Sequence, residues 1–146
     1  MKCNYPLTKK YLGRVWEAQG KEGRLEYRKA NLQMMLTDTA VHWSDTPRSS
    51  SPDMQRKQTI QAEIDAVEQE IVEARQETEK IREEIGMTIC RLSNPLSQRV
   101  LILHYLQHMS WRQAAREMQI CKATVYRLRD AGYKELEELL KAAQTD

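Results

Sequence analysis

The sequence contains no phenylalanine, and aromatic residues make up only 6% of its 146 residues. With so few large aromatic side chains, thin packing between helices is a better expectation than a thick globular core. The longest apolar run covers only residues 100–103, whereas a membrane-spanning helix needs about 18 such residues. The first residues also lack the apolar stretch of a signal peptide. We therefore expect a cytoplasmic protein with no membrane partner.

Cysteine and histidine are scarce, and their spacing argues against a disulfide framework or a metal site. Cys3, Cys90 and Cys121 are odd in number and far apart, so they form no CxxC zinc motif. His104 and His108 have the four-residue spacing that can chelate a metal on one helix. No Glu lies between them, unlike in HExxH, and no third ligand is evident. We expect neither a metal nor another cofactor.

The residue sets that carry common catalytic chemistry are also missing. We find no Ser/His/Asp set, no carboxylate pair typical of an acid–base site and no glycine-rich phosphate loop. The expectation is a binding protein and not an enzyme.

The formal net charge of +2 hides segments of unlike charge. Residues 1–52 carry nine basic and five acidic side chains, and residues 53–92 carry six basic and ten acidic ones. Residues 93–134 carry seven basic and only two acidic side chains. A basic segment therefore follows an acidic one, and basic clusters are typical of surfaces that meet polyanions.

Proline, glycine and serine divide the chain into four parts. Residues 1–41 favour helix, although Gly13, Gly20 and Gly23 each cost about 1 kcal/mol relative to alanine inside a helix. Residues 42–53 read as a Ser/Pro linker. A coiled-coil helix is predicted for 54–92 and a helix-turn-helix domain for 93–146. The predicted fold class is all-α, with a long helical hairpin or coiled coil followed by three helices.

The helix predicted for 54–92 has a heptad seam. Its apolar or small residues alternate in steps of four and three along Ile60, Ile64, Val67, Ile71, Ala74, Thr78, Ile81, Ile85, Thr88 and Leu92. At 1.5 Å per residue this helix is roughly 55 Å long, so it must pack on something outside the C-terminal domain. A parallel homodimer is one possible partner. The alternative, which we favour, is an intrachain hairpin in which Leu25, Leu32 and Met35 cover the seam, with dimerisation through the remaining apolar surface left open.

Three closely spaced helices are predicted after residue 93. Asn94 can cap the first, with Pro95 at its first position, and its apolar face is predicted to comprise Leu96, Val100, Leu101, Leu103 and Leu106. Ser110 and Gln113 have the spacing of a capping box for the second helix. A turn over 119–121 leads to a third helix beginning near Lys122. Tyr105 and Trp111 are expected to be core residues.

The spacing of inward residues over 111–128 is that of a helix-turn-helix. Ala115 is small where two helices cross, Ile120 is apolar in the turn, and Val125 is β-branched at the first inward position of the next helix. Gln119 stands where a left-handed backbone usually selects glycine, at a cost of about 1–2 kcal/mol. Cys121 replaces a common serine cap, and a helix N-terminus can lower the pKa of such a thiol. The alternative is an ordinary three-helix bundle, which the basic charge of the segment disfavours.

The third helix is predicted to enter the major groove of double-stranded DNA. Its candidate DNA-binding residues lie off the inward face: Lys122, Thr124, Tyr126, Arg127 and Arg129. Arginine can pair with guanine, while lysine and threonine can bind phosphate. Arg112 and Gln113, at the start of the preceding helix, are predicted to hold the flanking DNA backbone.

The segment "PLSQRVLILHYLQHMSWRQAAREMQICKATVYRLRDAGYKELEELL" resembles the promoter-reading C-terminal domain of bacterial sigma factors. With the helical, Ser/Pro-interrupted region before it, the whole chain resembles the ArpU/RinA-like phage regulators that activate late genes. This resemblance implies a transcription regulator that faces DNA with Lys122, Thr124, Tyr126, Arg127 and Arg129, and it makes RNA polymerase a candidate second partner. Gln119 and Cys121 depart from the usual pattern of the turn.

Two other functions fit the same organisation. The DNA-recognition (small) subunit of a phage packaging terminase also joins a helix-turn-helix to a coiled-coil oligomeriser. A protein-only adaptor would dock on RNA polymerase without touching DNA. The oligomeric state and DNA binding itself distinguish these alternatives.

Overall fold

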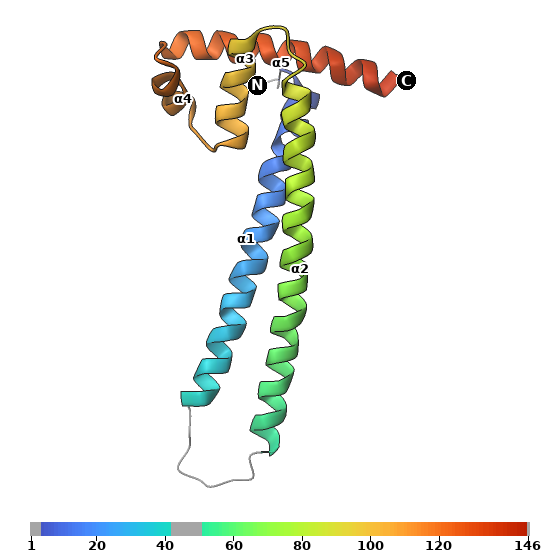
Figure 1. Ribbon diagram of the computed structural model, residues 1–146, viewed down its shortest axis with the longest axis vertical. Coiled ribbons are helices and arrows are strands. Elements are labelled where there is room, and N and C mark those ends of the chain that lie inside the picture. The colour runs from blue at the N-terminus through green and yellow to red at the C-terminus, as the bar shows by residue number, and fades with distance from the viewer. Residues whose placement is uncertain (1–3, 42–50, 146) are drawn as a thin grey trace. The chain divides into compact units, whose positions relative to one another are not determined.

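The computed structural model describes residues 4–41 and 51–145, and the regular structure within these ranges is helical. The elements are α1 (Pro6–Val41), α2 (Ser51–Ile89), α3 (Pro95–Leu101), the π-helical segment η1 (Ile102–Leu106), α4 (Trp111–Met118) and α5 (Lys122–Thr145) (Figure 1). The predicted all-α fold, a long hairpin followed by a smaller helical domain, is confirmed. None of the helices in these ranges is long and apolar enough to cross a membrane.

The chain forms two compact units. The hairpin unit is Ala18–Glu77, and the terminal unit combines Met1–Glu17 with Thr78–Asp146. The predicted linker, 42–53, lies outside the described residues except for its last three, which form the first turn of α2. A proline is tolerated in that turn because the first turn of a helix leaves its N–H groups unpaired anyway.

The hairpin unit is held together by the seam predicted along α2. Side chains at heptad spacing on α2 pack on apolar side chains of α1, and the cluster comprises Leu25, Leu32, Leu36, Ile60, Ile64, Val67 and Ile71. The seam therefore pairs with α1 of the same chain, as the hairpin prediction expected. Burial of this stripe outweighs the low helix propensity of Gly20 and Gly23, which both lie within α1.

The prediction for one seam residue of α1 is wrong. Met35 is 44% exposed, whereas Leu36 packs on the cluster. Leu25, Leu32 and Leu36 follow one another in steps of seven and four, which keeps them on one side of the helix. Met35 is turned by about 100° from Leu36 and so lies off that side.

The terminal unit has its own apolar core, to which both long helices contribute. Its buried members come from the first turns of α1, the last turns of α2 and the helices that follow: Leu12, Val15, Ile85, Ile89, Leu92, Leu101, Tyr105, Tyr133 and Leu136. The predicted burial of Tyr105 is confirmed, and Trp111 packs at the edge of the core. The two buried tyrosines supply aromatic bulk that phenylalanine supplies in many other cores.

Helices α3 and α5 approach each other closely through small residues. Ser97 is buried, whereas Leu96, predicted for the inward face, is 52% exposed. The Ser97 hydroxyl donates to the Leu128 carbonyl at 2.9 Å. A Cβ built on Gly132 would lie 3.5 Å from the Ser97 Cβ and 3.1 Å from Cδ1 of Leu101. A leucine in place of Ser97 would separate the two helices, so the small residue takes the inward position.

The close approach at Gly132 leads to a prediction about stability. We expect Gly132→Leu to lower the free energy of unfolding by about 1–3 kcal/mol, because the added side chain overpacks the contact between α3 and α5. A matched control is Gly23→Leu on α1, where an added Cβ meets nothing within 4 Å. That control should be neutral or slightly stabilising because leucine favours helix over glycine. Urea unfolding followed by circular dichroism measures both, and equal midpoints would contradict the prediction.

The beginning of α1 is capped by a carboxylate from α5. Glu137 is only 5% exposed, and its Oε2 accepts both the N–H and the hydroxyl of Thr8, each at 2.8 Å. Its Oε1 accepts the N–H of Leu7 at 3.2 Å, and the Thr8 hydroxyl also lies 3.2 Å from the Tyr133 carbonyl. A negative charge is stabilised at this place because the free N–H groups of a helix start carry partial positive charge. This contact ties the first turn of α1 to α5.

Candidate nucleic-acid interface

Helix α4 begins at the predicted capping box. The Ser110 hydroxyl accepts the N–H of Gln113 at 3.1 Å, and the side-chain oxygen of Gln113 accepts the N–H of Ser110 at 2.8 Å. Arg112 lies in the same turn and is exposed. Gln113 thus has its oxygen committed to the cap, and its NH₂ group is the part that can still donate to a phosphate.

The turn between α4 and α5 has the left-handed backbone that the sequence predicts. Gln119 has φ 57° and ψ 42°. Its N–H donates to the Arg116 carbonyl at 3.1 Å, and the N–H of Ile120 donates to the Ala115 carbonyl at 3.0 Å. These bonds satisfy the last carbonyls of α4, as at helix ends where glycine usually stands. The turn is therefore formed despite the missing glycine.

Helices α3, α4 and α5 meet at a small apolar core beneath this turn. Val100 and Val125 are fully buried and Ala115 is 7% exposed, and the partly buried residues around them are Trp111, Met118, Ile120 and Leu128. The inward positions predicted for a helix-turn-helix are confirmed as packing positions. The same core determines which side of α5 remains exposed.

The first two turns of α5 carry polar side chains that are not buried with Val125. Lys122 and Arg127 are exposed, and Thr124 is half-buried. The Thr124 hydroxyl lies 3.0 Å from the Cys121 sulfur and 3.4 Å from Nη2 of Arg127. The predicted phosphate donor is thus the centre of a short polar chain at the start of the helix.

Cys121 is exposed and carries a free thiol. The hydroxyl of Thr124 lowers the pKa of this thiol, and backbone N–H groups at the start of α5 act in the same direction. The pKa of the Cys121 thiol is therefore lowered, which is the direction expected at a helix N-terminus. The main cause is the neighbouring Thr124 hydroxyl.

Arg129 lies on a different side of α5 from Arg127. Positions two apart on a helix differ by about 200° in direction, so Arg127 and Arg129 point to nearly opposite sides of α5. The Nε of Arg129 is 2.9 Å from Oδ1 of Asp130. Its Cζ lies 4.8 Å from the ring centre of Tyr126 and 5.3 Å from that of Trp111. Aromatic faces and one carboxylate hold this guanidinium.

Two exposed residues on the side of Arg127 were missed by the sequence prediction. Ala123 lies four residues before Arg127, and Lys134 lies seven residues after it, and both are exposed. The helical period of 3.6 residues places all three on one side. Lys134 could have been predicted from the sequence by following the helical period of α5 beyond its second turn.

Most cations of the predicted basic segment face solvent without a carboxylate partner. The structure describes residues 4–41 and 51–145. Within these ranges, Arg129 is the only one of the seven basic residues of 93–134 that forms an ion pair. The other six are exposed: Arg99, Arg112, Arg116, Lys122, Arg127 and Lys134. Unpaired cations on one small domain attract polyanions.

His104, one of the two histidines considered as a metal pair, is engaged in other contacts. Its ring stacks on Trp111 with 3.6 Å between ring centres, and its Nδ1 lies 2.7 Å from the Met109 carbonyl. Burial lowers the pKa of His104, and the charge of Arg129 adds to that effect, against the raising effect of the Met109 carbonyl. His108 is exposed.

Comparison with known proteins places the chain in a family. A search of the curated proteins gave no significant match, and a search of the solved structures gave none either. A family model described as "Protein of unknown function (DUF1492)" matches residues 32–137. The match covers more than half of the chain and includes the capping box, the left-handed turn and the exposed cations of α5. The chain therefore belongs to the DUF1492 family.

Proposed function

We propose that the protein is a sequence-specific DNA-binding regulator of transcription and not an enzyme. The observation that carries the proposal is the exposed side of α5, where Arg127 and Lys134 face solvent without an ion-pair partner within the described ranges, while Lys122 is exposed at the start of the helix. This side lies opposite the packing of Val125, and α4 with its left-handed turn supports it. A helix supported in this way fits the major groove.

The resemblance to ArpU/RinA-like regulators refines the proposal. We infer that the protein activates late genes of a phage or prophage, and that it also contacts RNA polymerase. The helical hairpin offers a surface for that second partner because α1 and α2 bury their seam on each other and leave charged residues outside.

The buried seam also favours the regulator over the packaging subunit. An oligomeriser of the coiled-coil type needs a seam that is open to other chains. Along the hairpin unit the seam of α2 is covered by Leu25, Leu32 and Leu36 of the same chain. A monomer or a dimer is therefore the expected state. A mass measurement that finds a ring of about eight or more subunits would favour the packaging function instead.

The salt dependence of DNA binding tests the proposal. Genomic fragments are first selected on the immobilised protein, and the affinity for an enriched fragment is then measured between 50 and 200 mM salt. With about three phosphate contacts, we expect the affinity to fall roughly 40-fold over this range, because bound counterions are released from DNA.

Two results would contradict the proposal. The first is that no fragment is enriched over random DNA of the same length. The second is a pull-down of RNA polymerase that persists while no fragment is shifted in a gel, which is the outcome expected of the protein-only adaptor.

A further inference from the structure

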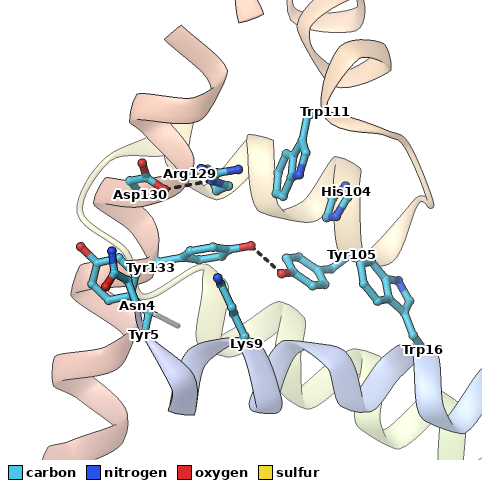
Figure 2. Close-up of a pocket in the computed structure, with 10 residues that line it drawn as sticks. All are labelled: Asn4, Tyr5, Lys9, Trp16, His104, Tyr105, Trp111, Arg129, Asp130 and Tyr133. Carbon is cyan, nitrogen blue, oxygen red and sulfur yellow. Dashed lines mark hydrogen bonds and ion pairs between the residues drawn. The ribbon is translucent and has the colours of Figure 1, made fainter. Parts of the chain in front are cut away.

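Aromatic side chains line an open cavity of about 420 Å³ in the terminal unit (Figure 2). This volume is within the range of small-molecule sites. The rings on its wall come from α1, η1, α4 and α5 and from the residue before α1: Tyr5, Trp16, His104, Tyr105, Trp111 and Tyr133. The flat faces of these rings favour ligands that contain a planar ring.

The wall is held together by contacts among its own members. The hydroxyls of Tyr105 and Tyr133 are 2.5 Å apart, and burial raises the pKa of both phenols, so both stay neutral. Trp16 stacks on Tyr105 with 4.7 Å between ring centres. His104 and Tyr105 are neighbours in the π-helical η1, whose wider turns are common at functional sites. A preformed wall lowers the entropy cost of binding.

Two cations face this cavity, and only one carboxylate accompanies them. Lys9 and Arg129 line it together with Asp130, whose carboxylate is bonded to Nε of Arg129. The terminal nitrogens of Arg129 and the ammonium of Lys9 have no hydrogen-bond acceptor among the residues that the structure describes. Figure 2 shows Arg129 beside Trp111 and Lys9 reaching toward the tyrosine pair. The free N–H donors of Arg129 and Lys9 can therefore bind an anionic group in a cavity that is lined by aromatic rings.

We propose that this cavity binds a small aromatic anion, that is, a planar ring carrying a phosphate or a carboxylate. The terminal N–H groups of Arg129 bind two oxygens of the anionic group, since the guanidinium fork matches both chemistries. Lys9 supplies the second positive charge, and the ring lies against Trp111 and the tyrosine pair. The site does not depend on DNA binding, so the two proposals can fail separately.

Calorimetric titration of the full chain in the absence of DNA tests the site. Two probes represent the two ligand classes: adenosine 5′-monophosphate is a planar ring with a phosphate, and indole-3-acetate is a planar ring with a carboxylate. Adenosine and inorganic phosphate represent the ring and the anion alone. We expect one of the two anionic probes to bind with a Kd below about 1 mM, and we expect adenosine and phosphate each to bind at least about tenfold more weakly.

Neighbouring lysines provide a matched pair of variants. Lys9→Gln should weaken binding of the better probe by about five- to tenfold, and Arg129→Gln by at least about tenfold. Lys10→Gln should leave the affinity unchanged, because Lys10 is exposed like Lys9 but does not line the cavity. Absence of binding by both anionic probes at 1 mM would overturn the proposal. Equal affinities of Lys9→Gln and Lys10→Gln would overturn it as well.

Discussion

Replacing Arg127 with alanine is expected to weaken binding to the cognate DNA site by about 1–3 kcal/mol, or roughly 5-fold to 150-fold. Arg127 is exposed on α5, away from the Val125 core, and its Nη2 makes only a long 3.4 Å contact with the Thr124 hydroxyl. The guanidinium is therefore available to a guanine base. Fluorescence anisotropy with a labelled cognate site at low salt measures the effect.

Two further variants show what Arg127 recognises. Arg127→Lys keeps the charge but loses the planar fork, so it should behave like the alanine variant if Arg127 reads a base, and like the wild type if it meets a phosphate. Arg28→Ala removes an exposed arginine of the hairpin unit, and it should leave DNA affinity nearly unchanged. If Arg127→Ala binds the cognate site as tightly as the wild type, the assignment of Arg127 is wrong.

Replacing Glu137 with alanine is expected to lower the free energy of unfolding by about 3 kcal/mol. The change removes three hydrogen bonds to a charged acceptor and leaves the N–H and hydroxyl of the buried Thr8 with fewer partners. For a chain of this size the melting temperature should fall by roughly 6–12 °C. Thermal unfolding followed by circular dichroism measures it. Glu138→Ala, at the exposed neighbouring residue, serves as the control, and equal melting temperatures of the two variants would refute the role of Glu137.

The same carboxylate makes stability depend on pH. Burial raises the pKa of Glu137, but the hydrogen bonds from Thr8 and Leu7 outweigh burial and hold the pKa below its ordinary value of 4.5. A group whose pKa is lowered in the folded state contributes stability above its unfolded pKa. That contribution is lost as the pH falls below about 4.5 and through the lowered folded value. Glu137→Gln should therefore lose less stability than the wild type between pH 5 and pH 3.

The sequence predicts those parts of the structure that depend on residues close together in the chain. The heptad steps of α2, the Ser110 capping box and the left-handed turn at Gln119 each involve residues within a few positions of one another. Their physical causes act along one helix, so the sequence alone reveals them. The predicted cap of α3 at Asn94 is confirmed for the same reason, since its side chain accepts the N–H of Leu96 at 2.9 Å.

Contacts between distant segments could not be predicted in this way. Glu137 and Thr8 are 129 positions apart, and nothing in the charge of a glutamate inside one helix indicates that it caps another helix. The position of Arg129 among aromatic rings likewise depends on how α4 and η1 pack on α5. The sequence prediction grouped Arg129 with Arg127 because both lie off the inward face of the helix, although the helical period already sets them about 200° apart.

The discontinuous terminal unit has a consequence for the order in which the chain folds during synthesis. At about 5–20 residues per second, roughly 6–26 s separate the appearance of Thr8 from that of Glu137. The hairpin unit is continuous in sequence and can assemble earlier, whereas Leu12 and Val15 must wait for partners made much later. During that interval the apolar side chains of Leu12 and Val15 in the nascent chain remain exposed to solvent. Slower translation should therefore lengthen the time for which Leu12 and Val15 are exposed to chaperones and proteases.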